Sequence, residues 1–319
     1  MSKSLPVLRF ALVAAALSMI PQLMPAQVDE MNVACTAKNL VDSVNVNEYT
    51  FKAYEEHTSD AFSACLEVVK AGVVVYRKVE EGGDFALGQK AETEGGIPEI
   101  ANGTNVSGNG QPEMLVSYFS GGAHCCMTME IFDLKPQLKL LLSLDAGNSD
   151  YSHFELDKAT GVYDFVSREQ VFAYWHTSYA ESPMPLVILK PVLDARGNLN
   201  YRLDWTKMQK PAPADSVWND DLKQAQSAFA EDAAEGDYSA GSGLWTPMLE
   251  LIYSGQSEFA WKLVDAAWPK RKSGKDAFEA DLCGQLTRSP FWQDLQPTLK
   301  NPPAACAKAL APTAGAKHR

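Results

Sequence analysis

The decapeptide GGAHCCMTME, residues 121–130, sets His124 beside two adjacent cysteines, Cys125 and Cys126. Imidazole, thiolate and thioether groups together suit a soft metal such as Cu(I). A histidine next to a cysteine also makes the thiol more acidic and more reactive. His124, Cys125 and Cys126 are therefore the candidates for metal capture or for thiol redox chemistry.

The alternation of residue types predicts that residues 124–131 form a half-buried strand. Successive side chains of a strand point to opposite faces, so the soft ligands would be divided between two faces. This division counts against a single metal site. The apolar face would hold Cys125, Met127, Met129 and Ile131, and the polar face His124, Cys126, Thr128 and Glu130.

Three interpretations of the cysteine pair remain open. Cys125 and Cys126 could be joined to each other in a strained turn helped by Gly121 and Gly122. Each could instead do separate structural work, with Cys125 in the core or bonded to a distant partner such as Cys283. In the third interpretation His124 and the two cysteines carry metal or redox chemistry. The strand pattern favours a structural role.

The first 26 residues have the pattern of an export signal. Lys3 and Arg9 precede the apolar stretch FALVAAALSMI at 10–20, and MPA at 24–26 offers a small residue for cleavage. The stretch is shorter than the roughly 20 residues that a membrane-spanning helix needs, and no later segment reaches that length. We therefore predict a periplasmic or extracellular protein without a membrane span.

Export would bring the cysteines into an oxidising compartment, where disulfides persist. Proximity in the chain predicts that the first cysteine pairs with the second and the fifth with the sixth. The six disulfide candidates are Cys35, Cys65, Cys125, Cys126, Cys283 and Cys306.

Composition limits the class of partner. The chain has 319 residues, 46% of them apolar, and a formal net charge of −12. Nucleic-acid binders need clustered basic side chains that displace counterions, and the longest basic run is KRK at 270–272. We expect no nucleic-acid partner, and a protein, peptide or glycan ligand instead.

The pattern of apolar residues predicts an α+β fold. From about residue 65 to 205, short runs rich in Val, Tyr and Phe alternate with turn residues, which is typical of antiparallel strands in a propeller-like arrangement or a sandwich. After a Pro-rich connector the period becomes helical, with Trp245, Trp261, Trp268 and Trp292 expected to pack the helices. The expected divisions are a signal peptide at 1–26, a β-rich domain at 27–206, a linker at 207–216, a helical region at 217–300 and a disordered tail at 301–319.

A glycine-containing loop precedes one of the predicted strands. In NVSGNGQPEMLV, residues 105–116, oxygen-bearing side chains alternate before an apolar run, and Gly110 permits a sharp turn. This spacing resembles the calcium-loop repeat of the FG-GAP and integrin-propeller type. The resemblance implies a metal site at positions one, three, five, seven and nine, which are Asn105, Ser107, Asn109, Gln111 and Glu113.

Only Glu113 among these five is charged, and because calcium affinity follows ligand charge, any binding of Ca²⁺ would be weak. We therefore predict no tightly bound cofactor. A poorer copy, DKATGVYDFV at 157–166, has Gly161 and Asp164 in matching places, but Lys158 falls on the third position. The resemblance implies that both loops are turns inherited from a calcium-binding ancestor.

The longer string from the first loop through GGAHCC is also similar to a pattern found in uncharacterised exported bacterial proteins. That similarity implies an extracytoplasmic β domain and supplies no mechanism. The sequence contains no Gly-x-Ser-x-Gly elbow, His-Glu-x-x-His, phosphate loop or dinucleotide fingerprint. His176 lies among aromatic residues, where a packing role is expected.

Together these features favour an exported, non-catalytic binding or envelope-associated module. The alternative is a periplasmic or secreted hydrolase or a thiol-redox enzyme that uses His124 with Cys125 and Cys126. An enzyme should gather His124 or His176 with carboxylates in a deep pocket. A binding module should show scattered polar groups and an exposed aromatic patch.

Overall fold

The computed structural model describes residues 35–57, 62–93, 96–123, 125–148, 151–194, 196–231 and 241–311. The predicted signal peptide, residues 1–26, and His124 lie outside the described residues, as does the side chain of Cys125. The described chain folds into three antiparallel four-stranded sheets followed by helices, so the predicted α+β class is confirmed.

The first sheet is a meander in which each strand pairs with the next along the chain. Its second strand alternates buried and half-buried residues, and Tyr49, Phe51 and Ala53 face the core. Asn47, whose φ is +53°, makes the tight turn before that strand, a conformation that asparagine tolerates better than most residues. The strands are β1 (Leu40–Val46), β2 (Tyr49–His57), β3 (Phe62–Lys70) and β4 (Val73–Glu81).

The middle sheet is buried on both faces. Alternate residues of β6 enter different clusters, since Met114 packs with the first sheet and Leu115 with the third. The same alternation in β7 sends Ile131 towards the third sheet and Phe132 towards the first. The strands are β5 (Asp84–Leu87), β6 (Glu113–Gly122), β7 (Cys125–Asp133) and β8 (Lys139–Gly147).

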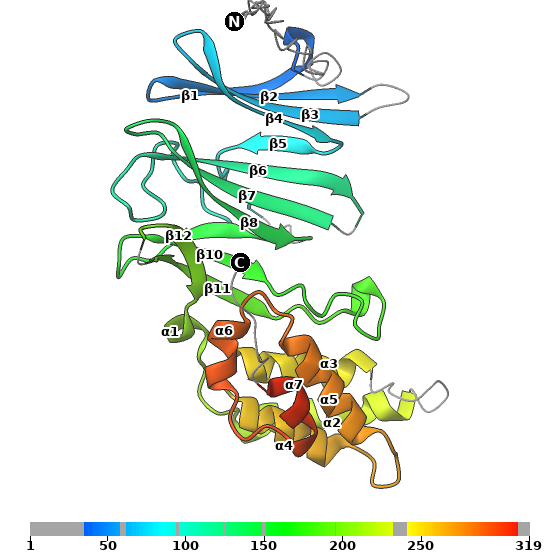
Figure 1. The fold of residues 1–319 in the computed structure, drawn as a ribbon. Helices are drawn as coiled ribbons and strands as arrows, with labels where there is room; N and C mark the ends of the chain where they lie inside the picture. Colours follow the sequence, from blue (N-terminus) through cyan, green and yellow to red (C-terminus); the bar gives the residue numbers. More distant parts are fainter. Residues whose placement is uncertain are drawn as a thin grey trace, which may run out of the picture.

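The third sheet completes a stack. Figure 1 shows the first, middle and third sheets following one another along the molecule, with the helices beyond the third sheet. In the described part of the chain the stack is open and does not close into a ring. The strands of the third sheet are β9 (His153–Leu156), β10 (Tyr163–Arg168), β11 (Leu186–Leu193) and β12 (Leu199–Leu203).

The helices pack on the far side of the third sheet and share its hydrophobic core. Among the described residues no helix combines the length and the apolar character that crossing a bilayer requires. The α-helices are α1 (Trp205–Met208), α2 (Asp215–Glu231), α3 (Gly241–Tyr253), α4 (Ser257–Ala267), α5 (Lys275–Leu286), α6 (Trp292–Leu295) and α7 (Ala307–Leu310). The 3-10 helices are η1 (Ala37–Asn39), η2 (Tyr179–Glu181), η4 (Gln296–Thr298) and η5 (Ala304–Cys306).

Tryptophans hold the helical region together, as the sequence predicts. Trp245, Trp261 and Trp268 are each less than a tenth exposed. Trp261 Nε1 donates to the carbonyl of Lys300 at 3.0 Å, and Trp268 Nε1 donates to that of Lys272 at 2.9 Å. Because these rings are buried, they pack the core and do not line a ligand groove.

Two predicted boundaries are wrong. The tail expected to be disordered from residue 301 contains η5 and α7, because the disulfide between Cys283 and Cys306 anchors it to α5. Residues 312–319 lie outside the described residues. The connector expected at 207–216 begins inside α1, where the side chain of Asp204 accepts from the Thr206 amide and caps that short helix.

Candidate functional site

The two calcium-type loops occupy equivalent places in consecutive sheets. Residues 105–113 lead into β6, and residues 157–164 lead into β10, which is likewise the second strand of its sheet. The loops touch, since the Tyr163 amide donates to the Val106 carbonyl at 3.1 Å. Gly108 has φ +77°, and a Cβ there would lie 2.3 Å from Val162 Cγ1. Glycine at 108 therefore permits the close approach.

Hydrogen bonds within the first loop engage most of its predicted calcium ligands. Asn105 Oδ1 accepts from the Gly110 amide at 3.1 Å, and Asn109 Oδ1 accepts from the Gln111 amide at 2.7 Å. Glu113 Oε2 accepts from the amides of Val106 at 2.6 Å and Ser107 at 2.8 Å, and the Ser107 hydroxyl also donates to this carboxylate. In these bonds the side-chain oxygens of the loop accept hydrogen bonds from backbone amides of the same loop.

Glu113 is the only carboxylate among the five predicted ligands, and it is 1% exposed. Burial raises the pKa of Glu113, the hydrogen bonds from Ser107 and Val106 oppose that rise, and the neighbouring Asp133 adds to it. A dication prefers several charged oxygens. The donor set is therefore a poor match for tightly held Ca²⁺, and we assign no functional step to a metal at this loop.

In the second loop a lysine from another element supplies the positive charge. Lys207 of α1 contacts Asp164, at the ninth position, and its Nζ lies 3.1 Å from Asp157 Oδ2. Asp157 also accepts from the Ala159 amide and the Thr160 hydroxyl, each at 2.9 Å. These donors and Lys207 lower the pKa of Asp157, whereas burial raises the pKa of Asp164. An ammonium group thus bridges the two carboxylates of this loop.

The predicted strand through the His-Cys-Cys motif is present as β7. Met129 and Ile131 lie on one face, towards the third sheet, as the alternation predicts. The opposite face is partly covered: Glu130 is only 2% exposed and receives Lys78 Nζ at 2.8 Å, whereas Thr128 is half-buried. Alternation alone cannot reveal that a second sheet covers the polar face of a strand.

Both disulfides predicted from chain proximity are present. Cys35 is bonded to Cys65 and Cys283 to Cys306. A bond between Cys125 and Cys283 is therefore wrong. Cys126 is also disulfide-bonded and takes part in neither of these pairs. The Cys126 amide donates to the Ser120 hydroxyl at 2.7 Å.

His176 packs against aromatic rings, in line with its expected role. Its ring centroid lies 4.8 Å from that of Trp175 and 6.3 Å from that of Trp245. His176 Nε2 is also 2.5 Å from Asp281 Oδ2, which links the irregular segment after β10 to α5. None of the main cavities among the described residues is lined by His176.

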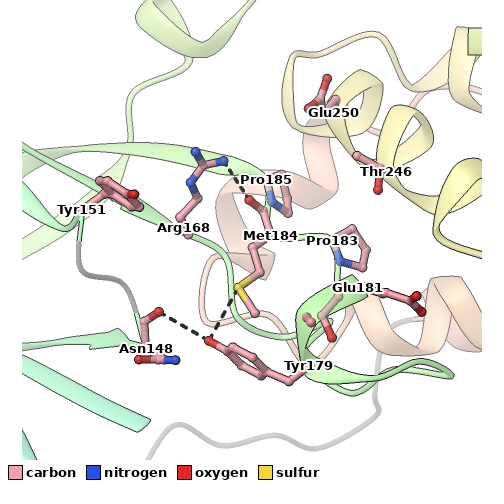
Figure 2. A pocket seen from close by; sticks show the side chains of 12 residues that line it. Asn148, Tyr151, Arg168, Tyr179, Glu181, Pro183, Met184, Pro185, Thr246 and Glu250 are labelled. Atoms are coloured by element: carbon pink, nitrogen blue, oxygen red, sulfur yellow. Dashed lines mark hydrogen bonds between the residues drawn. The ribbon is translucent and has the colours of Figure 1, made fainter. Parts of the chain in front are cut away.

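A large cleft of the described chain lies where the third sheet meets the helices. It has a volume of about 710 Å³. Figure 2 shows its wall held together by two contacts to Met184: the Arg168 guanidinium donates to the carbonyl at 3.1 Å, and the Tyr179 hydroxyl lies 4.0 Å from the sulfur. The Tyr179 hydroxyl also lies 3.4 Å from the carbonyl of Asn148.

Side chains of both charges reach this cleft from separate elements. Arg168 ends β10, Glu181 lies in η2 and Glu250 lies in α3, and all three are exposed. Tyr151, just before β9, is 61% exposed and presents its ring to the same cleft. The arrangement offers one guanidinium, two carboxylates and aromatic surface, which suits binding by charge and ring contact.

Sequence reasoning missed these cleft residues. In the segment that contains Tyr179 and Glu181, the sequence pattern pointed only to His176. Arg168 and Glu250 are more than 80 residues apart, so no local pattern links them. The single available signal was the cluster of aromatic and proline residues at 172–185, which is too irregular for a strand or a helix.

Comparison of the chain with protein-family models, with curated proteins and with solved structures finds no match.

Proposed function

We propose that the protein is an exported, non-catalytic binding module and that its ligand is a peptide held in the cleft around Arg168. The observation that carries this proposal is the lining of the cleft. Scattered charged groups and an exposed tyrosine surround it, and no histidine is among its lining residues. That is the arrangement expected of a binding module rather than of an enzyme.

The charges favour a peptide over a neutral glycan. Arg168 projects from the sheet wall, and Glu250 projects from the helix wall. A ligand that meets both needs groups of both signs, which a peptide carries and a neutral glycan lacks. The net charge of −12 would also steer basic peptides towards the protein. Tyrosine gives large contact area at a small entropic cost.

Export is supported by two independent features. The first 26 residues have the charge and apolar pattern of a signal peptide. The bonds Cys35–Cys65 and Cys283–Cys306 suit an oxidising compartment. Expression of the full chain in a bacterial host, followed by fractionation and intact-mass measurement, tests this part. Recovery of uncleaved protein from the cytoplasm only would contradict it.

The binding function is tested by screening the purified protein in parallel on a peptide array and a glycan array. We expect retention of peptides that contain basic side chains, and no retention of neutral glycans. Retention of glycans alone would replace the peptide assignment, and retention of neither class would remove the binding proposal.

A thiol-redox enzyme of the same compartment is the second candidate. It would use His124 with Cys125 and Cys126, and the observation that favours it is that Cys126 is disulfide-bonded and only half-buried. The test is to incubate the oxidised protein with a reduced dithiol peptide and to measure formation of the peptide disulfide. The Cys126→Ser variant should lose this exchange if the redox function holds.

A further inference from the structure

We propose that a second cavity binds a small amphipathic carboxylate, a molecule with an apolar body and one anionic head group. The cavity has a volume of about 430 Å³ and lies between β8, β10 and the segment that joins α5 to α6. This volume falls within the range of about 300–1,000 Å³ that small-molecule sites occupy. The site is separate from the peptide cleft, although Arg168 reaches both.

Part of the cavity lining is apolar. Phe165 and Leu189 are buried in the third sheet, and Tyr201 is 8% exposed beside them. Leu144 of β8 and Phe291, just before α6, are half-buried and form the sides. Removing an alkyl or aryl group from water against these side chains is favourable in proportion to the apolar area buried.

Hydrogen-bond donors also line the cavity. Arg168 donates to the Met184 carbonyl, and Arg288 Nη1 donates to Gln285 Oε1 at 2.9 Å. Within the part of the chain that the structure describes, neither guanidinium forms an ion pair with a carboxylate. Gln170 also lines the cavity, and its Nε2 has no hydrogen-bond partner among the described residues. A ligand carboxylate would give these two guanidinium groups the anionic acceptor that the described residues do not supply.

Gly147 makes room for this arrangement. Its φ is +58°, and a Cβ at that position would lie 2.4 Å from Gln170 Cγ. Only glycine therefore lets the end of β8 pass so close to the glutamine side chain. The Nε2 atom of Gln170 is buried without a hydrogen-bond partner among the described residues.

The carboxylates at the cavity do not favour a cationic ligand instead. Glu169 accepts from the Tyr253 hydroxyl at 2.8 Å, from the Ser289 hydroxyl at 2.5 Å and from the Val171 amide at 3.0 Å. Asp145 is exposed at the rim and accepts from the Gly147 amide at 2.9 Å. The buried acid is therefore already satisfied by three donors, and the unmatched groups are donors.

The experiment compares octanoate with 1-octanol by titration calorimetry on the full chain. The two probes share an alkyl body, so the difference between them reports the head group. We expect octanoate to bind at least about tenfold more tightly than 1-octanol, a difference that one charge-assisted hydrogen bond can supply. The Arg288→Gln variant should lose most of this preference, because Arg288 lines this cavity and not the cleft.

Two further variants make the result specific. Arg271→Gln removes one exposed positive charge from a residue that lines neither cavity, so octanoate affinity should not change. Leu144→Trp should fill part of the cavity and weaken both probes. Equal affinity for octanoate and 1-octanol, binding of neither, or equal effects of Arg288→Gln and Arg271→Gln would each overturn the proposal while leaving the peptide cleft untouched.

Discussion

The ammonium group of Lys207 contacts the carboxylate of Asp164, which is 4% exposed and holds the ninth position of the second calcium-type loop. The same ammonium lies 3.1 Å from Asp157 Oδ2. In the calcium-loop pattern that this sequence resembles, the acid at the ninth position is a metal ligand. In this chain the positive charge is the ammonium group of Lys207, a side chain of α1. The negative charge of Asp164 is therefore balanced without an ion from solution.

Replacing Lys207 with methionine should destabilise the fold. The change leaves the buried Asp164 carboxylate without its counter-charge, and removing one partner of a buried ion pair costs about 3–5 kcal/mol. Because Lys207 is 31% exposed, we expect the lower end of that range in urea unfolding. The control is Lys190→Met, whose partner Asp204 keeps its bonds to Thr206. Equal losses in the two variants would contradict the role assigned to Lys207.

The buried Glu113 carboxylate should give stability a recognisable pH dependence. Burial raises its folded-state pKa, so the folded chain holds this proton more tightly than the unfolded chain. The stabilisation is complete below the unfolded pKa of about 4.3 and is lost as the pH rises through the raised folded pKa. The free energy of unfolding of the wild type relative to Glu113→Gln should therefore fall as the pH rises above about 4. A difference that is constant or rises over this range would argue against a raised pKa.

Calcium should bind the first loop weakly. Glu113 is the single carboxylate among the five predicted ligands, and it already accepts hydrogen bonds from Val106 and Ser107. We expect a dissociation constant no tighter than about 10⁻⁴ M, in the range of extracellular modules, measured by calorimetry with the Asn109→Ala variant as control. Micromolar affinity that the variant abolishes would mean that the loop rearranges to expose its oxygens.

Disulfide mapping by mass spectrometry should recover the Cys35–Cys65 and Cys283–Cys306 peptides and should show no thiol at Cys126. Because the Cys283–Cys306 bond closes a loop of 23 residues, its removal by the double serine variant should cost about 3 kcal/mol. The loss is measured by urea unfolding under oxidising conditions. A free thiol at Cys126 would contradict the disulfide assigned to this residue.

Local patterns were sufficient for many of the elements. Period-two alternation predicted β7, and short apolar runs bounded by turn residues predicted strands in the region of β6 and β10. The helices from α2 to α5 follow from their apolar spacing. Each of these depends on contacts between residues close in the chain.

The parts that could not be predicted depend on contacts between distant residues. The alternation pattern predicts that Glu130 is solvated. In the structure the first sheet covers Glu130, which forms an ion pair with Lys78, 52 residues away in the sequence. Lys207 lies 43 positions from Asp164, so its place in the second loop has no local signal. The cleft is assembled from β10, η2 and α3, and only the packing of helices on the third sheet brings Arg168 and Glu250 to the same hollow. The spacing of residues in the sequence does not predict contacts between residues that are far apart in the chain.

The central claim is that the cleft around Arg168 binds a peptide without transforming it. The most direct test is titration of a basic peptide selected from the array into the wild type and into Tyr151→Ala, Glu250→Gln and the control Glu99→Gln, an exposed acid away from the cleft. We predict that the first two variants weaken binding about tenfold or more, that the control matches the wild type, and that the peptide is recovered intact. Unchanged affinity in Tyr151→Ala and Glu250→Gln, or recovery of a cleaved peptide, would contradict the account.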